Sequence, residues 1–115
     1  MRKIDAAELK RMLDEDQELV LINVLDAGAF DEEHIPGSHN VPSNRLDLPR
    51  KVAELAGGKD RQVVVYCSNE ACQASSHAGQ RLEKSGFINV GHFEGGMQAW
   101  KRAGYPVHGG AGAPS

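Results

Sequence analysis

A chain of 115 residues, 40% of them hydrophobic and 25% charged, suits a single globular domain with a buried core. The formal net charge of −3 provides no basic surface for nucleic acid or an anionic membrane, and no apolar stretch approaches the roughly 20 residues of a membrane span. The N-terminal residues turn polar at once and lack the apolar core of a secretory signal, so we expect a cytoplasmic protein.

The first half of the chain alternates between helical and strand patterns. Asp5 is placed to cap a helix over the residues that follow it. The apolar run over residues 19–24 predicts a buried strand, and a short extended piece is expected at residues 41–42. Apolar residues over 46–55 then predict a helix that stops at the glycine pair 57–58.

The second half continues the alternation. Residues 62–66 form a β-branched and aromatic run that is typical of a strand buried on both faces. A polar loop over residues 68–76 leads into a helix that ends at residues 85–86. Residues 89–93 predict another strand, and residues 97–103 predict a short helix.

Strands that alternate with helices imply right-handed crossovers and a mostly parallel sheet. We therefore expect an α/β fold whose central sheet is covered by helices on both faces. Because no internal repeat or interior linker is visible, the domain is predicted to span residues 1–108. The glycine-rich residues 109–115 are expected to form a flexible tail.

Cys67 is the most informative residue, because it stands at the C-terminal end of the strand predicted over residues 62–66. Open α/β sheets bind ligands in the crevice at this edge. Unpaired backbone N–H groups and the positive end of a helix dipole favour a thiolate over a thiol there. We therefore predict that Cys67 is a nucleophile, and the alternative is a buried, inert strand residue.

The only other cysteine, Cys72, lies in the same short loop as Cys67. A permanent bridge between them would close too few residues to stabilise the fold much. No further cysteine or histidine pair has the spacing of a zinc site, and His39, His92 and His108 show no metal-ligand spacing. Reactivity explains the two thiols better than a structural disulfide does, and no metal is expected.

Several segments that follow one another along the chain together resemble a known family. They are residues 21–25, 34–38, 40–42, 64–67, 86–90, 93–100 and 104–107. In this order they resemble the rhodanese domain, a family of single-domain sulfurtransferases, over nearly the whole chain except the tail. The resemblance implies a three-layer sandwich and a cysteine, at Cys67, that carries sulfur as a persulfide. It also implies that His34 fixes the turn that follows it, and the implied mechanism requires no cofactor.

The active loop departs from the family's usual six-residue cradle, which often carries arginine or lysine. Residues 68–76 hold no cation, include Glu70 and add the thiol of Cys72. Asn23 and Leu25 stand where the family usually has an aspartate–arginine pair. These departures disfavour doubly charged thiosulfate and favour persulfide or polysulfide donors.

The loop is expected to hold the sulfur donor. The predicted substrate-binding residues are Ser68, Asn69, Glu70, Ala71 and Gln73. Converging backbone amides of residues 68–73 would hold the negative charge of the persulfide. Arg45 lies in a segment that, by resemblance, approaches this loop, and it is a candidate anion contact.

Cys72 has two interpretations that the sequence leaves open. In one, it attacks the Cys67 persulfide, releases sulfide and leaves a disulfide that a cellular reductant reopens. In the other, Cys72 starts the following helix and points into its packing. Loop geometry decides between them, because a disulfide requires the two Cα atoms to come within about 7 Å.

The leading function is transfer of sulfane sulfur from a persulfide, polysulfide or thiosulfate donor to a thiophilic acceptor through Cys67. The expected partners are a small sulfur donor, a thiol or cyanide acceptor and a thiol reductant, for a monomer or weak dimer. One alternative is a sulfur-carrier or docking module without turnover. A phosphatase or arsenate reductase is disfavoured, because the oxyanion-gripping arginine of a Cys-x5-Arg loop is replaced by Gln73.

Overall fold

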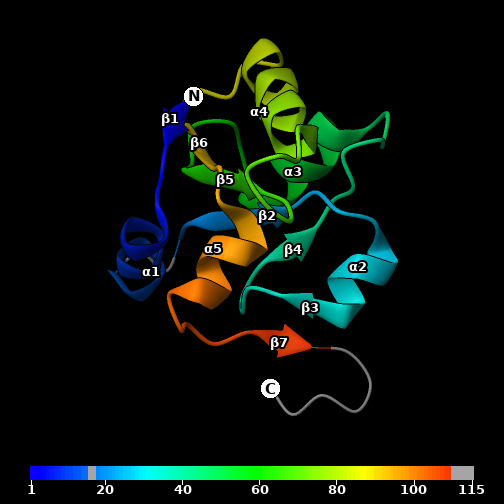
Figure 1. The fold of residues 1–115 in the computed structure, drawn as a ribbon. Coiled ribbons are helices and arrows are strands. Elements are labelled where there is room, and N and C mark those ends of the chain that lie inside the picture. Colours follow the sequence, from blue (N-terminus) through cyan, green and yellow to red (C-terminus); the bar gives the residue numbers. More distant parts are fainter. Residues whose placement is uncertain (16–17, 110–115) are drawn as a thin grey trace.

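Five parallel strands form the centre of the molecule (Figure 1). The computed structural model describes residues 1–15 and 18–109. The strands of the sheet are β1 (Arg2–Lys3), β2 (Val20–Asn23), β4 (His39–Asn40), β5 (Val63–Tyr66) and β6 (Val90–Phe93). They lie in the order β1-β6-β5-β2-β4, and each strand runs parallel to its neighbours. The predicted α/β fold with a parallel central sheet is confirmed.

Helices cover both faces of the sheet, which makes three layers (Figure 1). The helices are α1 (Ala6–Glu15), α2 (Ala27–Glu32), α3 (Leu48–Ala56), α4 (Ala74–Lys84) and α5 (Gly96–Arg102). Side chains of α3 and α4 pack on one face, and side chains of α1 and α5 pack on the other. Within residues 1–15 and 18–109, no helix combines the length and the apolar character needed to cross a membrane.

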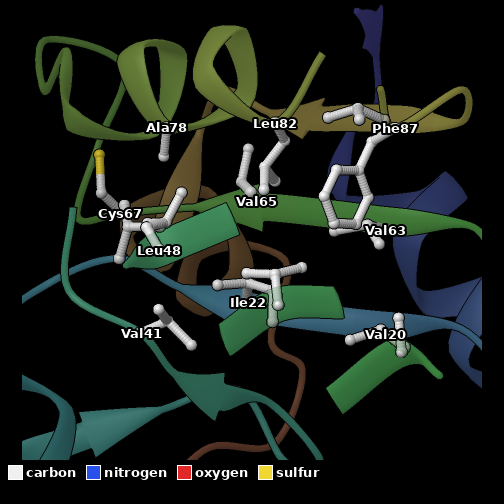
Figure 2. Close-up of a cluster of buried hydrophobic side chains, with 14 residues drawn as sticks. Val20, Ile22, Val41, Leu48, Val63, Val65, Cys67, Ala78, Leu82 and Phe87 are labelled. Carbon is white, nitrogen blue, oxygen red and sulfur yellow. The ribbon is translucent and has the colours of Figure 1, made fainter. Parts of the chain in front are cut away.

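The middle strand, β5, is buried on both faces, as its continuous apolar run predicts. Figure 2 shows the side of the core between the sheet and α4, where Val65 lies near Leu82 and Val63 lies near Phe87. Tyr66 belongs to the opposite cluster and packs there with Trp100. Burial of a side chain of this size contributes about 1.5–3 kcal/mol, so β5 is anchored from two sides.

Local sequence signals set the helix ends. The Asp5 carboxylate accepts the backbone N–H of Glu8 at 2.8 Å and caps α1, as predicted. Helix α3 ends where Gly57 adopts a left-handed φ of 73° and donates its N–H to the Ala53 carbonyl. Leu46, predicted to lie on the apolar face of this helix, precedes it and is 97% exposed.

Some short elements differ from the sequence-based expectations. Helix α2 was not predicted, and the extended piece expected at residues 41–42 pairs instead as β4, two residues earlier. A separate antiparallel ladder joins β3 (Glu33–His34) to β7 (His108–Gly109). Gly109, which the sequence places in the tail, therefore belongs to a strand. The rest of the predicted tail, residues 110–115, lies outside the described residues.

Candidate active site

Cys67 directly follows β5, at the edge of the sheet where the strand ends. Its side chain belongs to the core cluster between the sheet and α4, and its sulfur points toward the beginning of that helix (Figure 2). The residue is only 1% exposed. The position at the strand end is the predicted one, but the sulfur is covered rather than open to solvent.

The sulfur of Cys67 forms a disulfide with the sulfur of Cys72. Their Cα atoms lie 6.5 Å apart, within the reach of a disulfide. Cys72 precedes α4, whose first residue is Ala74, and packs partly buried against the same cluster as Cys67. The loop therefore has the geometry that a reaction between the two sulfurs requires, and in this form neither is a free thiol.

Asn69 organises the loop between the two cysteines. Its side-chain oxygen accepts the N–H of Ala71 at 2.9 Å, and its backbone carbonyl accepts the N–H of Cys72 at 3.1 Å. The sulfur of Cys67 instead lies 3.6 Å from the carbonyl oxygen of Cys72 and 4.0 Å from that of Asn69. The predicted cradle of converging amides is therefore not formed in the disulfide state, because Asn69 takes up two of these amides.

A serine side chain lies within hydrogen-bonding distance of the Cys67 sulfur, a contact that the sequence does not predict. The Ser75 hydroxyl lies 3.4 Å from Cys67 Sγ and 2.8 Å from Nε2 of His92 on β6. Ser75 is 1% exposed, whereas His92 is half-buried. Burial lowers the pKa of His92; Glu94 raises it and Lys3 lowers it further, both more weakly.

The sequence spacing does not predict the contact between Ser75 and His92, because they are 17 positions apart and belong to different elements. One signal was available. Ser75 stands three residues before Ala78 and seven before Leu82, so it shares the buried stripe of α4. A hydroxyl on such a stripe indicates a specific partner, because burial without a hydrogen bond is costly.

The turn between β6 and α5 fixes the start of the active loop. The N–H groups of Met97 and Gln98 donate to the carbonyls of Cys67 and Ser68, each at 2.9 Å. Gly96 approaches the Cys67 carbonyl so closely that a Cβ there would collide with it, and its φ is +60°. The backbone of the candidate nucleophile is thus held from the side opposite α4.

A cavity of about 550 Å³ lies beside the loop. Ser68 and Asn69 line it together with Leu25 and Met97, and Lys101 lies at its wall, paired with Glu33 at 2.8 Å. Ser68 and Asn69 are therefore the two predicted loop residues that this cavity brings together.

The other predicted loop residues lie elsewhere. Ala71 and Gln73 are exposed, and Gln73 stands at the start of α4. Glu70 is also exposed and lines a separate hollow with Lys3 and Glu94. The loop thus turns its middle toward an acidic part of the surface.

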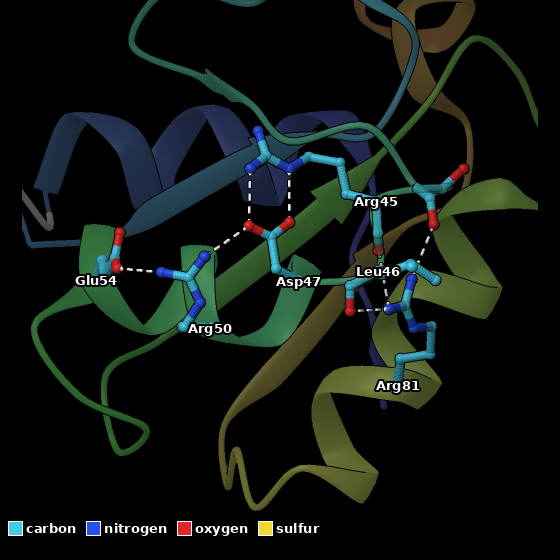
Figure 3. A network of polar contacts seen from close by, with 7 residues as sticks. Arg45, Leu46, Asp47, Arg50, Glu54 and Arg81 are labelled. Atoms are coloured by element: carbon cyan, nitrogen blue, oxygen red, sulfur yellow. Dashed lines mark hydrogen bonds and ion pairs between the residues drawn. The ribbon is translucent and has the colours of Figure 1, made fainter.

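Arg45, the candidate anion contact, is held by a carboxylate. Its guanidinium makes two hydrogen bonds to Asp47, at 2.7 and 2.8 Å, and Arg50 bonds to the same carboxylate at 2.8 Å (Figure 3). The hydrogen bond from Arg45 and its charge lower the pKa of Asp47 to about 2. Arg45 is not among the residues that line the cavity beside Ser68. Its role as an anion contact stays a prediction.

Arg81 has a structural role. From α4 it donates hydrogen bonds to the carbonyls of Ser43, Arg45 and Leu46 at 2.9 to 3.2 Å (Figure 3). These bonds tie α4 to the segment that leads into α3. His77, one turn earlier on α4, is exposed.

A buried polar network lies at the end of β2, where Asn23 stands in place of the aspartate that the family resemblance implies. Asn23 donates to the Tyr66 hydroxyl at 3.0 Å, and that oxygen also accepts the N–H of Ile35 at 3.0 Å. Ser38 lies 2.9 Å from the same hydroxyl. Burial raises the pKa of Tyr66 above its ordinary value. The network joins the ends of β2 and β5 to the turn over residues 35–38.

His34, which precedes this turn, contacts Phe30 of α2, and its expected role in fixing the turn stays a prediction. Its Nδ1–H donates to the carbonyl of Phe30 at 2.8 Å, and the two rings stack with their centroids 3.9 Å apart.

Comparison with known proteins decides the family. A model of the rhodanese-like domain matches residues 5–103. The chain belongs to this family. A thiosulfate sulfurtransferase from Pseudomonas aeruginosa has a similar structure, with a TM-score of 0.85 and 28% sequence identity. The similarity covers 100% of this rhodanese-like domain and 22% of that chain.

Relatives that carry sulfurtransferase names are of very different lengths. A protein named sulfurtransferase from Allochromatium vinosum is 28% identical over 93% of this chain and 94% of its own length. The probable adenylyltransferase/sulfurtransferase MoeZ of Mycobacterium tuberculosis is 32% identical over 86% of this chain. The rhodanese-like domain spans only 24% of MoeZ. The family assignment therefore supports sulfurtransferase ancestry without defining a substrate.

Proposed function

We propose that this rhodanese-like domain is a sulfurtransferase that works through a persulfide on Cys67. The donor is a persulfide, polysulfide or thiosulfate, and the acceptor is a thiol or another thiophile such as cyanide. The observation that carries the proposal is the placement of Cys67 at the end of β5, joined to Cys72 within the same loop. A reactive dithiol at the ligand-binding edge of a parallel sheet suits sulfur exchange.

The cycle begins with reduction of the disulfide. A dithiol reductant gives up two electrons and two protons and becomes a disulfide, while the Cys67–Cys72 bond breaks and both cysteines become thiols. Cys67 then loses its proton, and its thiolate attacks the outer sulfur of the donor. The donor's sulfur–sulfur bond breaks, its electron pair leaves with the donor thiolate or sulfite, and Cys67 carries the persulfide.

The persulfide has two fates. An acceptor thiolate attacks the outer sulfur, takes it and returns Cys67 as a thiolate. Alternatively, the Cys72 thiolate attacks the inner sulfur, hydrosulfide leaves, and the Cys67–Cys72 disulfide forms again. The Cα separation of 6.5 Å supports this second route. The disulfide also protects Cys67 against over-oxidation.

The charges around the loop favour some donors over others. Glu70 is exposed and shares its hollow with Glu94, and residues 68–76 carry no lysine or arginine. Lys3 pairs with Glu94, so Glu70 is the carboxylate that repels a doubly charged donor such as thiosulfate, whereas a singly charged persulfide is repelled less. Persulfides and polysulfides are therefore the proposed preferred donors.

The same scheme defines the proposed surroundings of the protein. Redox-active disulfides operate in reducing compartments, where thiol reductants reopen them. We therefore propose a cytoplasmic protein that meets small sulfur donors and a thiol reductant, acts as a monomer or weak dimer, and uses no organic cofactor.

Mass spectrometry of the reduced protein tests the proposal. Incubation with glutathione persulfide should add one sulfur atom to Cys67 and none to a Cys67→Ala protein. An intramolecular disulfide after incubation supports the Cys72 route. Absence of both a sulfur gain and a disulfide with all three donor types would contradict the sulfurtransferase and support the docking module instead.

A further inference from the structure

Two contacts lead from the candidate nucleophile to the neighbouring strand. The Ser75 hydroxyl is 3.4 Å from Cys67 Sγ and 2.8 Å from His92 Nε2. Cys67 and Ser75 are each 1% exposed, so water has little access to this line of atoms. A serine hydroxyl both donates and accepts, and it can therefore pass a proton between its two neighbours.

The fold holds these three residues in a fixed relation. Val65 of β5, two residues before Cys67, pairs with His92 across the sheet, and Ser75 lies in the first turn of α4. The charged groups that face His92 are Lys3 from β1 and Glu94 just after β6. Lys3 and Glu94 are 3.4 Å apart and form an ion pair, and they act on the pKa of the imidazole in opposite directions.

The protonation state of the imidazole suits a proton acceptor. Burial lowers the pKa of His92, so the ring is neutral at pH 7 while the cysteines are joined. A neutral ring accepts a hydrogen bond at Nε2 when its proton is on Nδ1. The Ser75 hydroxyl can then donate to His92 and accept from a thiol at the same time.

We propose that Ser75 and His92 form a proton relay that activates Cys67 once the disulfide is reduced. Ser75 touches the reacting sulfur, and His92 is a positioning residue that acts through Ser75. The inference rests on the proposed role of Cys67 as the nucleophile. It supplies the anion stabilisation that the loop amides were expected to give and that the disulfide state does not show.

The relay moves one proton and no electrons. The S–H bond of Cys67 breaks and its proton passes to Ser75 Oγ, while the hydroxyl proton of Ser75 passes to His92 Nε2. The products are a thiolate and an imidazolium, so the net charge is unchanged. Ser75 then donates its hydrogen bond to the thiolate, and His92 donates to Ser75, which stabilises the sulfur anion.

The experiment measures the ionisation of Cys67 in the reduced protein without any sulfur donor. Iodoacetamide modifies the thiolate, and the rate at Cys67 is followed by peptide mass spectrometry across roughly pH 5 to 10. The peptide readout separates Cys67 from Cys72. The test variants are Ser75→Ala and His92→Gln. Their matched controls are Ser76→Ala and His77→Gln, which alter the next serine and an exposed histidine on α4.

Each test variant should raise the pKa of Cys67 by about one unit, and alkylation at pH 7 should slow about tenfold. The double variant should be no slower than the slower single variant, because both changes break one path. The controls should match the wild type. Glutamine retains a hydrogen-bonding group but takes up no proton. Slower alkylation of Cys67 in His92→Gln therefore results from loss of the base and not from loss of the hydrogen bond.

An unchanged pH profile in either folded variant would overturn the relay. If His92→Gln fails to fold, Ser75→Ala alone decides, since it removes a single oxygen. The outcome is independent of the sulfur-transfer test. Altered profiles with neither sulfur gain nor disulfide formation from any donor would contradict only the proposed function, whereas sulfur gain with unaltered profiles would contradict only the relay.

Discussion

Gly96 lies directly against the carbonyl group of Cys67. With φ of +60° it occupies a conformation that other residues rarely adopt, and a Cβ would meet the Cys67 carbonyl oxygen. The neighbouring Met97 N–H donates to that same oxygen at 2.9 Å. The close approach lets the α5 turn hold the backbone of the candidate nucleophile.

Gly96→Ala should therefore damage the site as well as the fold. The unfavourable φ alone should lower the free energy of unfolding by about 1–3 kcal/mol, and the collision should add to that loss and displace the loop. Gly104→Ala is the control, because its φ is +80° but nothing lies near its added methyl group. Urea unfolding and persulfide turnover are the measurements. Equal losses in both variants would show that the contact with Cys67 is unimportant.

Cys72→Ser should separate the two fates of the persulfide. The variant lacks the thiol that attacks Cys67, so reduced protein loaded from glutathione persulfide should retain the Cys67 persulfide and release sulfide slowly. Transfer to an external thiol should persist. Sulfide release is measured with the wild type as the reference. Release at the wild-type rate would rule out Cys72 as the resolving thiol.

The sequence predicts the position of Cys67 well because the signal is local. The buried run of β5 and the polar loop after it identify the strand end, and periodicity identifies α4. Helix α2 escapes prediction because its six residues include no buried side chain. Its cap, Asp26, accepts the N–H of Ala29 at 2.8 Å and is the one local cue.

The remaining parts of the site depend on contacts between distant segments. Strand β1 consists of two exposed residues with no pattern, and it becomes a strand only because β6 offers an edge. The Ser75–His92 contact arises because α4 packs over β6. The amide cradle was predicted from a general property of loops, and Asn69 binds two of these amides, one through its side chain and one through its backbone carbonyl.

Tyr66→Phe should destabilise the domain by about 1–3 kcal/mol. Removal of the hydroxyl leaves the buried amide of Asn23 and the N–H of Ile35 without their shared acceptor. Tyr105→Phe is the control, since Tyr105 is partly exposed and contacts Trp100 through its ring. Chemical denaturation of both variants measures the difference. A loss no greater than that of the control would contradict the importance of the network.

The pair of Arg45 and Asp47 should give stability that disappears in acid. The pKa of Asp47 falls from 3.8 to about 2, chiefly through its hydrogen bond to Arg45. Because the folded-state pKa is the lower one, the contribution is complete above pH 3.8 and is lost as the pH falls through 2. Both side chains are partly exposed, so the effect is small and weakens with salt.

Asp47→Asn tests this pH dependence. At low salt the wild type should unfold at a higher temperature than the variant near neutral pH, and the two midpoints should converge as the pH approaches 2. Arg45→Ala is the companion variant, because Asp47→Asn should have a smaller effect in its background. A difference that stays constant throughout the acid range would show that Asp47 is not the group responsible.

Glu70→Gln should raise kcat/KM for thiosulfate more than kcat/KM for persulfide donors. Glu70 is exposed in the hollow that also contains Glu94, and removal of its charge weakens repulsion of a doubly charged donor. We expect wild-type turnover of thiosulfate with cyanide to be slow, and kcat/KM for thiosulfate to rise severalfold at low salt in the variant.

Asp14→Asn, which removes the same charge from the far end of α1, is the control. Because screening weakens interactions between exposed charges, the gain should shrink at high salt. A wild type that already turns over thiosulfate as fast as persulfides would show that the absence of loop cations does not set donor preference.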